Sequence, residues 1–506
     1  MLSAALLAAF AAAASLESSL TSVAALPGEP RTVSAAGLAA DETPILTLEN
    51  ASAFDAGPSK LRLVLVGADD PPTADAVVAA VRWLKTAAPR PIRDRWIVSA
   101  LPLARFTEAD KLSLPRWLTF QAPDLIVEIG SGGRARVDGV RVESVPAAAA
   151  TDALRKLLGD PSLKRSTLHD TIVGRVTRQP IAIAPVLAQR YPGTPSVSYI
   201  PSVSWINTLK LASITGQTAL RAKVMDQIKP WLSGEQKMFG DRIQLTSIAG
   251  AMVFAELAAA GESGATPRAD QAAIPLAVEA ARLAAAEKSP GVAQYGGGWT
   301  DDMFMASTVL ARTGRWHGRE GDFDTLARLL AAYAGRLQRP DGLFNHAVDG
   351  PVTWGRGNGF AAMGLTEALT ALPPAHPGRS AILEIYRRQM AAAKTQQAPD
   401  GMWRQIVDDP AAYREETVTA MLFTALARGI RLGWVDRSYL PVAERAWRAL
   451  AAHIVADGTV IDVCASTGSG PTRRYYFDRP AITGADDRGG AMALLATMEM
   501  YELTRK

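Results

Sequence analysis

Acidic side chains lie at the beginnings of successive apolar segments in the second half of the chain. If those segments are helices that begin at one end of the fold, their carboxylates meet in one cavity and could carry out general acid/base chemistry. Each acid also has a simpler explanation, because a carboxylate at a helix start accepts backbone N–H groups and interacts favourably with the helix dipole. Asp241, directly after Gly240, fits that explanation best. The acids are Asp241, Asp301, Asp302, Glu415, Glu416, Asp486 and Asp487.

Aromatic, amide and basic side chains accompany these acids, and helix capping does not explain them. Apolar ring faces beside groups that bind hydroxyls are what a sugar requires from its binding site. The pattern therefore favours a carbohydrate site over a set of unrelated helix caps. The accompanying residues are Trp299, Phe344, His346, Trp354, Arg356, Asn358, Trp403, Gln405, Tyr475 and Tyr476.

Two of these residues have alternatives that the sequence leaves open. Arg356 lies between Gly355 and Gly357, whose small size lets a guanidinium approach a ligand and pair with a planar carboxylate. It could equally form a salt bridge to an acid of a neighbouring helix. His346 follows a strand-like Leu-Phe pair, and it could be a buried structural histidine or a residue that contacts substrate.

Two kinds of helix alternate from about Ser202 onward. One kind is apolar on nearly all sides and must be surrounded by protein, whereas the other is amphipathic and covers a surface. Strict alternation predicts two concentric rings, with the apolar helices inside and parallel to one another. The apolar helices are Ile243–Ala260, Met303–Ala311, Asn358–Leu372, Thr417–Ala427 and Gly490–Leu503. The amphipathic helices are Thr218–Leu232, Ala272–Glu287, Phe323–Leu337, Ala381–Lys394 and Tyr439–His453.

A closed double ring needs one more helix of each kind. Ser204–Ile214 supplies the sixth inner helix, although Asn207 and Lys210 make it less apolar. Ile183–Arg190 or part of the linker would supply the sixth outer helix. The sequence therefore predicts a mainly α protein whose larger part is an (α/α)6 barrel.

A short motif repeats along the predicted barrel, as expected of a ring built from similar units. Pro340-Asp-Gly-Leu-Phe344 recurs as Pro399-Asp-Gly-Met-Trp403 and, more weakly, as Asp457-Gly-Thr-Val460. Asp-Gly is turn chemistry, and the apolar pair after it predicts a short strand or hook that packs on the barrel end. The alignment places His346, Gln405 and Asp462 at equivalent positions.

The first half of the chain has a different pattern, typical of a smaller α/β domain. Leu61–Val66, Trp96–Ala100 and Leu125–Ile129 are predicted strands, and Thr73–Thr86 is a predicted helix. Strand, helix and strand at these lengths indicate a parallel sheet covered by helices.

Composition excludes several classes of function. The net charge of +4 comes from 54 basic and 50 acidic residues without a basic run, so neither a nucleic-acid partner nor an anionic membrane is expected. Cys464 is the single cysteine, which rules out a disulfide within the chain and a thiolate cluster. We expect no metal and no cofactor, and no later segment is long and apolar enough to span a membrane.

The first residues, Met1 to Ser15, are almost all Ala and Leu and resemble the apolar core of an export signal, although no basic residue precedes Arg31. An Ala-rich tail is the alternative. We therefore expect a signal peptide within residues 1–25 and a periplasmic or secreted protein, with the cytoplasm as the second choice. The other predicted domains are the α/β domain at residues 40–180 and the barrel at residues 200–506.

Seven ordered blocks resemble glycoside hydrolase families 88 and 105, and most of all the unsaturated rhamnogalacturonyl hydrolases of family 105. The resemblance runs from about Ser202 to the end of the chain. The blocks are Trp299-Thr-Asp-Asp-Met-Phe-Met305, Asp341-Gly-Leu-Phe-Asn-His346, Trp354-Gly-Arg-Gly-Asn-Gly359, Asp400-Gly-Met-Trp-Arg-Gln405, Glu416-Thr-Val-Thr-Ala-Met421, Cys464-Ala-Ser-Thr-Gly-Ser-Gly470 and Tyr475-Tyr-Phe-Asp-Arg479.

The resemblance implies an unusual hydrolysis of lyase-generated pectin- or rhamnogalacturonan-like oligosaccharides, whose non-reducing end is a 4,5-unsaturated uronic acid. An aspartate protonates C4 and activates the water that adds at C5, so the usual rule for paired glycosidase carboxylates does not apply. The matching acid/base is Asp301. The resemblance places His346, Trp354, Arg356 and Asp241 at substrate-binding positions. Together with them we predict that Trp299, Met305, Asn358, Trp403 and Gln405 bind substrate.

Two departures from the family pattern leave alternatives open. Where the family tends to read Asp-x-His-Gly, this chain reads Asp486-Asp-Arg-Gly489, and the α/β domain is an addition. That domain faintly resembles zinc carboxypeptidases without their metal ligands. A decayed barrel that binds carbohydrate without turnover is therefore the alternative, and a lyase or ordinary glycosidase is a third possibility.

Overall fold

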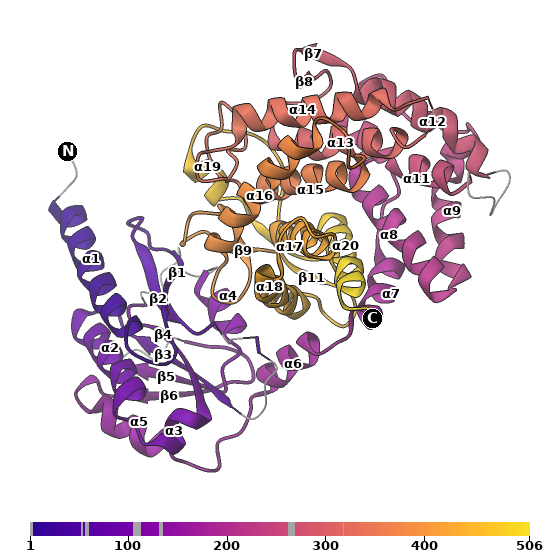
Figure 1. Cartoon of the computed structure of the whole chain (residues 1–506). Coiled ribbons are helices and arrows are strands. Elements are labelled where there is room, and N and C mark those ends of the chain that lie inside the picture. Colours follow the sequence, from indigo (N-terminus) through magenta and orange to yellow (C-terminus); the bar gives the residue numbers. More distant parts are fainter. Residues whose placement is uncertain are drawn as a thin grey trace. The chain divides into compact units, whose positions relative to one another are not determined.

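The computed structural model describes residues 4–51, 54–55, 60–104, 113–130, 135–261, 269–316 and 318–505, with only the backbone described for residues 4–12, 259–261 and 269–270. The chain forms two compact units (Figure 1). The first contains residues 1–177 with 398–402 and 409–413, and the second contains residues 178–397, 403–408 and 414–506. Each unit is described by itself.

A six-stranded sheet organises the first unit, with strand order β1-β2-β4-β3-β5-β6. The four strands β4, β3, β5 and β6 are parallel, and β1 and β2 extend the sheet as an antiparallel pair. The predicted parallel sheet is confirmed, and the sequence interpretation missed its outer strands. The strands are β1 (Thr32–Leu38), β2 (Pro44–Glu49), β3 (Leu61–Gly67), β4 (Trp96–Leu101), β5 (Leu125–Ile129) and β6 (Arg141–Val145).

Helices border this sheet, and one has a clear sequence signal at its start. Helix α2 (Pro71–Thr86) begins after Asp70, whose side chain accepts the backbone N–H of Thr73 at 2.9 Å. The pair Asp69-Asp70, at the position of the zinc motif in the faint carboxypeptidase resemblance, thus includes a helix cap. The remaining helices are α3 (Arg90–Arg95), α4 (Ser113–Phe120), α5 (Ala150–Leu158) and α6 (Thr167–Val176).

The second half of helix α1 (Ala4–Ala24) belongs to the core of the α/β unit. Leu20 and Val23 are fully buried with side chains of β3 and α2. The Lys85 ammonium donates to the carbonyl oxygens of Ala24 and Pro30, at 3.3 and 2.6 Å. This end of α1 is therefore fixed by packing and hydrogen bonds. Among the described residues, no helix is long and apolar enough to cross a membrane.

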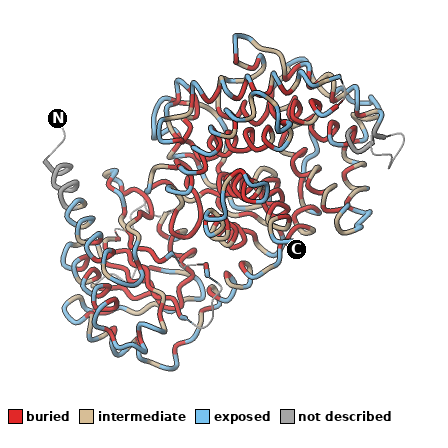
Figure 2. The backbone as a smooth tube through the Cα atoms, viewed as in Figure 1, coloured by how far each residue is buried: buried red, intermediate tan, exposed pale blue. Residues whose placement is uncertain are grey.

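The second unit is an (α/α)6 barrel, as predicted. Figure 2 shows buried backbone concentrated in its inner helices, whereas the outer helices expose one side. The inner helices contact one another in sequence, and α20 closes the ring against α8. The inner ring consists of α8 (Tyr199–Thr215), α10 (Leu245–Gly250) with α11 (Met252–Gly261), α13 (Thr300–Thr313), α15 (Gly355–Ala371), α17 (Glu416–Arg431) and α20 (Asp487–Thr504).

The outer ring confirms the predicted amphipathic helices and shows which segment forms the sixth of them. The sixth outer helix is α7, which packs against α8 and α20 and covers the predicted Ile183–Arg190 segment. The outer helices are α7 (Pro180–Arg190), α9 (Thr218–Leu232), α12 (Ala269–Ala284), α14 (Gly321–Leu337), α16 (Arg379–Gln396) and α18 (Leu440–His453).

One predicted inner helix differs from expectation. The segment Ile243–Ala260 forms two helices, α10 and α11, which meet at Ala251. Helix α10 begins at Leu245 with Gln244 as its N-cap residue, and Asp241 lies in the preceding loop, exposed to solvent. The prediction that Asp241 starts or caps an inner helix is therefore wrong, because the chain runs on for three residues before the first helical turn.

The repeated Asp-Gly motif forms the same turn three times. Gly342, Gly401 and Gly458 have φ angles of +96°, +101° and +84°, a backbone region that favours glycine. In each copy the Asp carboxylate accepts the N–H of the residue two positions later; for example, the N–H of Leu343 donates to Asp341 at 3.0 Å. The motif thus builds three equivalent hooks between an outer helix and the next inner helix.

The end of the barrel at which the inner helices finish is held by paired charges. Arg312 contacts Glu367 at 2.5 Å, and Arg428 contacts Glu499 at 2.8 Å. Arg312, Glu367 and Arg428 border a cavity of about 310 Å³. Because each carboxylate faces a guanidinium, this end has the features of a structural ion-pair network.

Candidate active site

The hooks place polar side chains directly over the beginnings of inner helices. The carbonyl of His346 accepts the N–H of Thr300, the first residue of α13, at 2.9 Å. The carbonyl of Gln405 accepts the N–H of Gly355, the first residue of α15, at 2.7 Å. These bonds satisfy helix N–H groups that would otherwise lack a partner. They also bring His346 beside Asp301.

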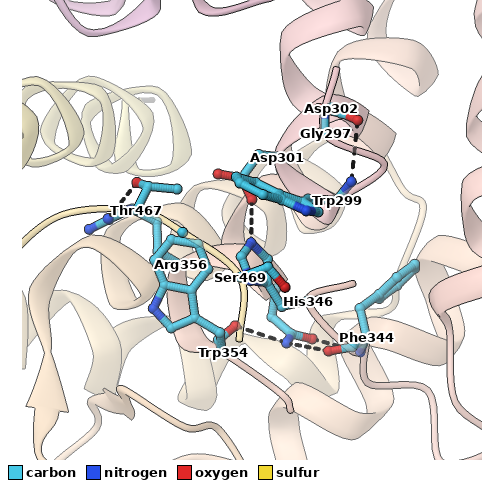
Figure 3. Close-up of polar contacts among 12 residues, drawn as sticks. Gly297, Trp299, Asp301, Asp302, Phe344, His346, Trp354, Arg356, Thr467 and Ser469 are labelled. Atoms are coloured by element: carbon cyan, nitrogen blue, oxygen red, sulfur yellow. Dashed lines mark hydrogen bonds and ion pairs between the residues drawn. The ribbon is translucent and has the colours of Figure 1, made fainter. Parts of the chain in front are cut away.

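A buried hydrogen-bonded chain of Asp301, His346 and Tyr476 forms the centre of the site. Oδ2 of Asp301 lies 2.9 Å from Nε2 of His346, and Nδ1 of His346 lies 2.9 Å from the hydroxyl of Tyr476. His346 and Tyr476 are fully buried, and Asp301 is 4% exposed. Figure 3 shows the Asp301 carboxylate directed at the imidazole.

This chain of groups suits an acid that must both give and take a proton. When Asp301 is ionised, Nε2–H of His346 donates to it and the Tyr476 hydroxyl donates to Nδ1. When Asp301 is protonated, it donates to Nε2, and Nδ1–H donates to the Tyr476 oxygen. Burial raises the pKa of Tyr476, which keeps its hydroxyl protonated. Both states of Asp301 therefore retain every hydrogen bond.

The neighbouring acid, Asp302, has a different task. Its carboxylate accepts the Tyr333 hydroxyl at 2.6 Å and the N–H groups of Gly297, Gly298 and Trp299 at 3.2, 2.6 and 3.2 Å. Burial is the largest influence on Asp302 and raises its pKa, although these hydrogen bonds oppose it. Asp302 therefore anchors the loop before α13, and Asp301 is the acid left for chemistry.

Aromatic rings enclose the imidazole. The ring centroid of His346 lies 4.5 Å from Trp354, 5.3 Å from Trp299 and 5.5 Å from Tyr476. Trp299 is half-buried, whereas Trp354 is fully buried and its indole N–H has no partner among the described residues. The structure thus brings together the predicted residues Trp299, His346 and Trp354 around Asp301 (Figure 3).

Arg356 is fully buried and is already bound to the protein. Its guanidinium donates to the carbonyl of Cys464 at 2.7 Å, to the carbonyl of Ser466 and to the hydroxyl of Thr467 at 3.1 Å. It also lies over the Trp354 ring, 4.7 Å from the centroid. Arg356 therefore fixes the segment after β11 (Val460–Cys464), and its Nε has no partner in the described chain.

Two residues predicted to contact substrate, Asn358 and Trp403, make hydrogen bonds within the protein. The amide of Asn358 pairs with both backbone groups of Phe344, at 2.8 and 2.9 Å, and so holds the first hook. Trp403 is fully buried in the barrel core, and its indole N–H donates to the carbonyl of Ala393 at 2.7 Å. With these groups occupied, Asn358 and Trp403 support the wall of the site.

The other two predicted residues are buried near the mouth. Gln405 donates to the carbonyl of Tyr476 at 3.1 Å and leaves its own amide oxygen without a partner among the described residues. Met305 lies one helical turn after Asp301 on α13 and is part of the apolar core. Gln405 thus keeps one buried acceptor without a described partner, whereas Met305 contributes packing.

Glu415 and Glu416 start α17 in contrasting environments. Glu415 caps the helix by accepting the N–H groups of Thr417 and Val418 at 2.9 and 2.7 Å, and it also accepts that of Cys464 at 2.8 Å. Glu416 is fully buried, and neither of its carboxylate oxygens has a partner in the described chain. Burial, reinforced by the charges of Glu415 and Asp486, raises the pKa of Glu416 well above its ordinary value.

Sequence reasoning missed two residues at this mouth. Tyr199 is the first residue of α8, and burial raises its pKa to about 12. Its position at an inner-helix start was the available signal. The Arg479 guanidinium lies 4.7 to 4.9 Å from the rings of Trp354, Tyr476 and Tyr475, and its Nη1 has no described partner. The sequence signal for Arg479 was its position at the end of the block Tyr475-Tyr-Phe-Asp-Arg479.

Comparison with known proteins places this chain in one family. The profile of Glycosyl Hydrolase Family 88 matches residues 201–504, and the chain belongs to that family. The unsaturated rhamnogalacturonyl hydrolase YesR of Bacillus subtilis (strain 168) is 30% identical over 177 residues, covering 33% of this chain and 50% of that protein. The unsaturated 3S-rhamnoglycuronyl hydrolase of Alteromonas sp. (strain LOR) is 27% identical over 175 residues, covering 32% and 42%. The matches thus span about half the length of these relatives.

Solved structures share the fold at low sequence identity. A family 105 glycoside hydrolase of C. acetobutylicum superimposes with a TM-score of 0.56 and 19% identity, covering 64% of this chain and 98% of that one. A polysaccharide lyase gives a TM-score of 0.53 and 16% identity, covering 66% and 99%. The barrel is therefore shared by proteins described as hydrolases and as a lyase, and the reaction must be argued from the site.

Proposed function

We propose that the barrel removes a 4,5-unsaturated uronic acid from the non-reducing end of oligosaccharides left by polysaccharide lyases, with pectin- or rhamnogalacturonan-like fragments as the substrate class. The observation that carries the proposal is the buried Asp301–His346–Tyr476 chain, because it retains its hydrogen bonds in both protonation states of Asp301. Membership of Glycosyl Hydrolase Family 88 and the names of the two relatives support the same activity.

The proposed reaction adds one water across the double bond. Protonated Asp301 gives its proton to C4, and positive charge develops at C5 and the ring oxygen. The resulting carboxylate removes a proton from water, whose oxygen bonds to C5, so that Asp301 ends as it began. The C5 hemiketal opens to a ketone, and the hemiacetal left at C1 expels the aglycone as an alcohol.

The surroundings of Asp301 support this use of water and a sugar ring. Trp299 is half-buried and can offer a ring face to an apolar sugar surface. The indole N–H of Trp354 and the amide oxygen of Gln405 are unused in the described structure. Asp302 is held by four donors and is not a nucleophile for C1. With Asp302 committed to these donors, the acid adjacent to Asp301 is not available as its catalytic partner, which favours hydration over the paired-carboxylate mechanism.

The alternatives predict different products. A carbohydrate-binding protein on a decayed barrel would bind these oligosaccharides without converting them. A lyase or an ordinary glycosidase would act on saturated chains. The intact hydrogen-bonded chain at Asp301 favours the hydrolase over the binding protein.

The test is a turnover screen with unsaturated disaccharides from pectin, rhamnogalacturonan, ulvan and glycosaminoglycans. We expect loss of the ultraviolet absorbance of the conjugated double bond together with release of the second sugar, and no action on the saturated disaccharides. Tight binding with no turnover of any member would favour the binding protein. Cleavage of saturated chains would favour the third possibility.

We also propose that the protein is exported, with processing before Leu16. The support is the Ala- and Leu-rich stretch before Ser15 and the packing of Leu20 and Val23 in the α/β core, which later cleavage would remove. Mass spectrometry of the N-terminus from cell fractions tests this. A full-length chain confined to the cytoplasm would contradict it.

A further inference from the structure

Arg356 is poorly placed to be the main partner of a substrate carboxylate. Its two terminal nitrogens donate to the carbonyls of Cys464 and Ser466 and to the hydroxyl of Thr467. Binding a carboxylate in the two-point manner typical of arginine would require breaking these bonds. The remaining Nε offers a single N–H in a fully buried setting. Arg356 therefore acts mainly on the segment 464–467.

A second guanidinium lies beside it and is less committed. Arg488, in the first turn of α20, donates to the same Cys464 carbonyl at a longer distance of 3.3 Å. Its side chain is 22% exposed, whereas that of Arg356 is fully buried. The two guanidinium groups thus meet at one neutral oxygen, which compensates the charge of neither.

The nearest acid does not neutralise Arg488 well. The carboxylate of Asp486 lies 3.8 Å from the Arg488 guanidinium. One oxygen of Asp486 already accepts the N–H groups of Arg488 and Gly489, at 2.9 and 3.0 Å, as the cap of α20. Asp486 is thus committed to the helix start, and the Arg488 guanidinium keeps donors for another partner.

The substrate chemistry requires a cation close to Asp301. In a 4,5-unsaturated uronate the carboxylate is attached to C5, the atom next to the C4 that Asp301 protonates. Direct contacts link the two places. Arg356 shares the Cys464 carbonyl with Arg488 and lies over the ring of Trp354. That ring is 4.5 Å from the imidazole that faces Asp301. The carboxylate and the guanidinium of Arg488 therefore belong to the same mouth of the barrel.

We propose that Arg488 binds the carboxylate of the unsaturated uronate and that Arg356 is a positioning residue for the segment 464–467. The inference rests on the proposed function and assigns a role to the residue that departs from the family's Asp-x-His-Gly pattern. It predicts that substrate selection by charge depends on Arg488.

The test compares an unsaturated disaccharide having a free carboxylate with its methyl ester. For Arg488→Gln we expect KM for the acid to rise about 10- to 100-fold, as for a lost charge-assisted pair, with kcat changed less and with no change for the ester. Arg488→Lys should recover part of the KM. Arg282→Gln, at an exposed surface pair on α12, is the matched control for loss of one charge and should leave both substrates unchanged.

Three outcomes overturn the assignment. They are an unchanged KM for the acid in Arg488→Gln, equal losses for acid and ester, and loss of the acid–ester difference in Arg356→Gln but not in Arg488→Gln. If the wild type converts none of the substrates, the proposed function fails. Titration calorimetry with the same acid and ester then tests separately whether Arg488 binds the carboxylate. Weaker binding of the acid alone by Arg488→Gln then upholds the assignment, and equal binding of acid and ester by both proteins overturns it.

Discussion

Nε2 of His346 lies 2.9 Å from Oδ2 of Asp301, although 45 residues separate the two in the chain. The carbonyl of His346 also accepts the N–H of Thr300, the residue before Asp301. The first hook is thus joined to α13 by backbone and by side chain at adjacent positions. This double attachment holds the imidazole in register with the acid, as a proton-transfer group requires.

Asp301→Asn should abolish this transfer while leaving the fold intact. The amide has nearly the shape of the carboxyl but cannot give a proton to C4 or take one from water. We expect kcat to fall about 100- to 10,000-fold in the absorbance assay, with an unchanged circular dichroism spectrum. Activity equal to wild type would exclude Asp301 as the acid/base.

Asp302→Asn is the matched control, one residue along the same helix. Here an NH2 group would face some of the N–H groups of the loop before α13, which the carboxylate now accepts. We expect a loss of about 1–3 kcal/mol in the free energy of unfolding, and a kcat that falls far less than in Asp301→Asn. If Asp302→Asn were as inactive as Asp301→Asn while equally stable to wild type, the division of tasks between the two acids would be wrong.

Tyr476→Phe tests the far end of the hydrogen-bonded chain. Without the hydroxyl, Nδ1 of His346 has lost its hydrogen-bond partner in both protonation states of Asp301, although Nε2 still faces the carboxyl group. We expect kcat to fall about tenfold, corresponding to one lost hydrogen bond, with KM little changed. Tyr386→Phe is the control, because its buried hydroxyl donates to the Ala425 carbonyl in the barrel wall. It should reduce stability and leave kcat unchanged; equal effects of the two variants on kcat would contradict the account.

Glu416 should make the barrel less stable as the pH rises. Burial raises its pKa in the folded state above the ordinary value of 4.5. The folded protein therefore binds this proton more tightly than the unfolded chain, and the stabilisation is complete below pH 4.5 and lost as the pH rises towards the folded pKa. Glu416→Gln carries no charge, so its stability relative to wild type should grow between pH 5 and pH 8.

Urea unfolding at several pH values measures this difference. Glu415→Gln serves as the control, since Glu415 accepts three backbone N–H groups and its loss should destabilise the protein throughout the range. A constant difference between wild type and Glu416→Gln at all pH values would show that Glu416 does not titrate as proposed.

Gly357→Ala tests the close packing behind the imidazole. A Cβ at this position would lie 2.7 Å from Oγ1 of Thr300 and 3.3 Å from Cδ2 of His346. Something must move, and a shift of His346 would disturb its contact with Asp301. We expect reduced kcat, whereas Gly335→Ala in α14, with open space around its Cβ, should be neutral or stabilising by about 0.5–1 kcal/mol. A fully active Gly357→Ala would contradict this reading.

The double ring could be predicted because each helix must match its surroundings along its whole length. The apolar α13 and the amphipathic α14 leave an unambiguous pattern, and periodicity even located α7. The break at Ala251 was not visible, because both halves of that segment are apolar. Asp241 was misplaced for the same reason, since an apolar run does not reveal where its first helical turn begins.

The location of the site could be predicted from the sequence, but the role of each residue in it was harder to predict. Residue type and family pattern point to Asp301, His346 and Trp354, which do lie together. They do not tell whether an amide such as Asn358 faces a ligand or a backbone, because that depends on the path of the hook. Tyr199 escaped notice because it precedes the predicted segment Ser204–Ile214 and lies far from the blocks.

The reaction run in D2O tests the central claim most directly. Wild-type enzyme and an unsaturated disaccharide are followed by absorbance and by NMR of the product. The account predicts that absorbance falls in step with aglycone release, that one deuterium enters at C4, and that Asp301→Asn does neither. Release of the aglycone with the double bond intact and no deuterium at C4 would contradict it.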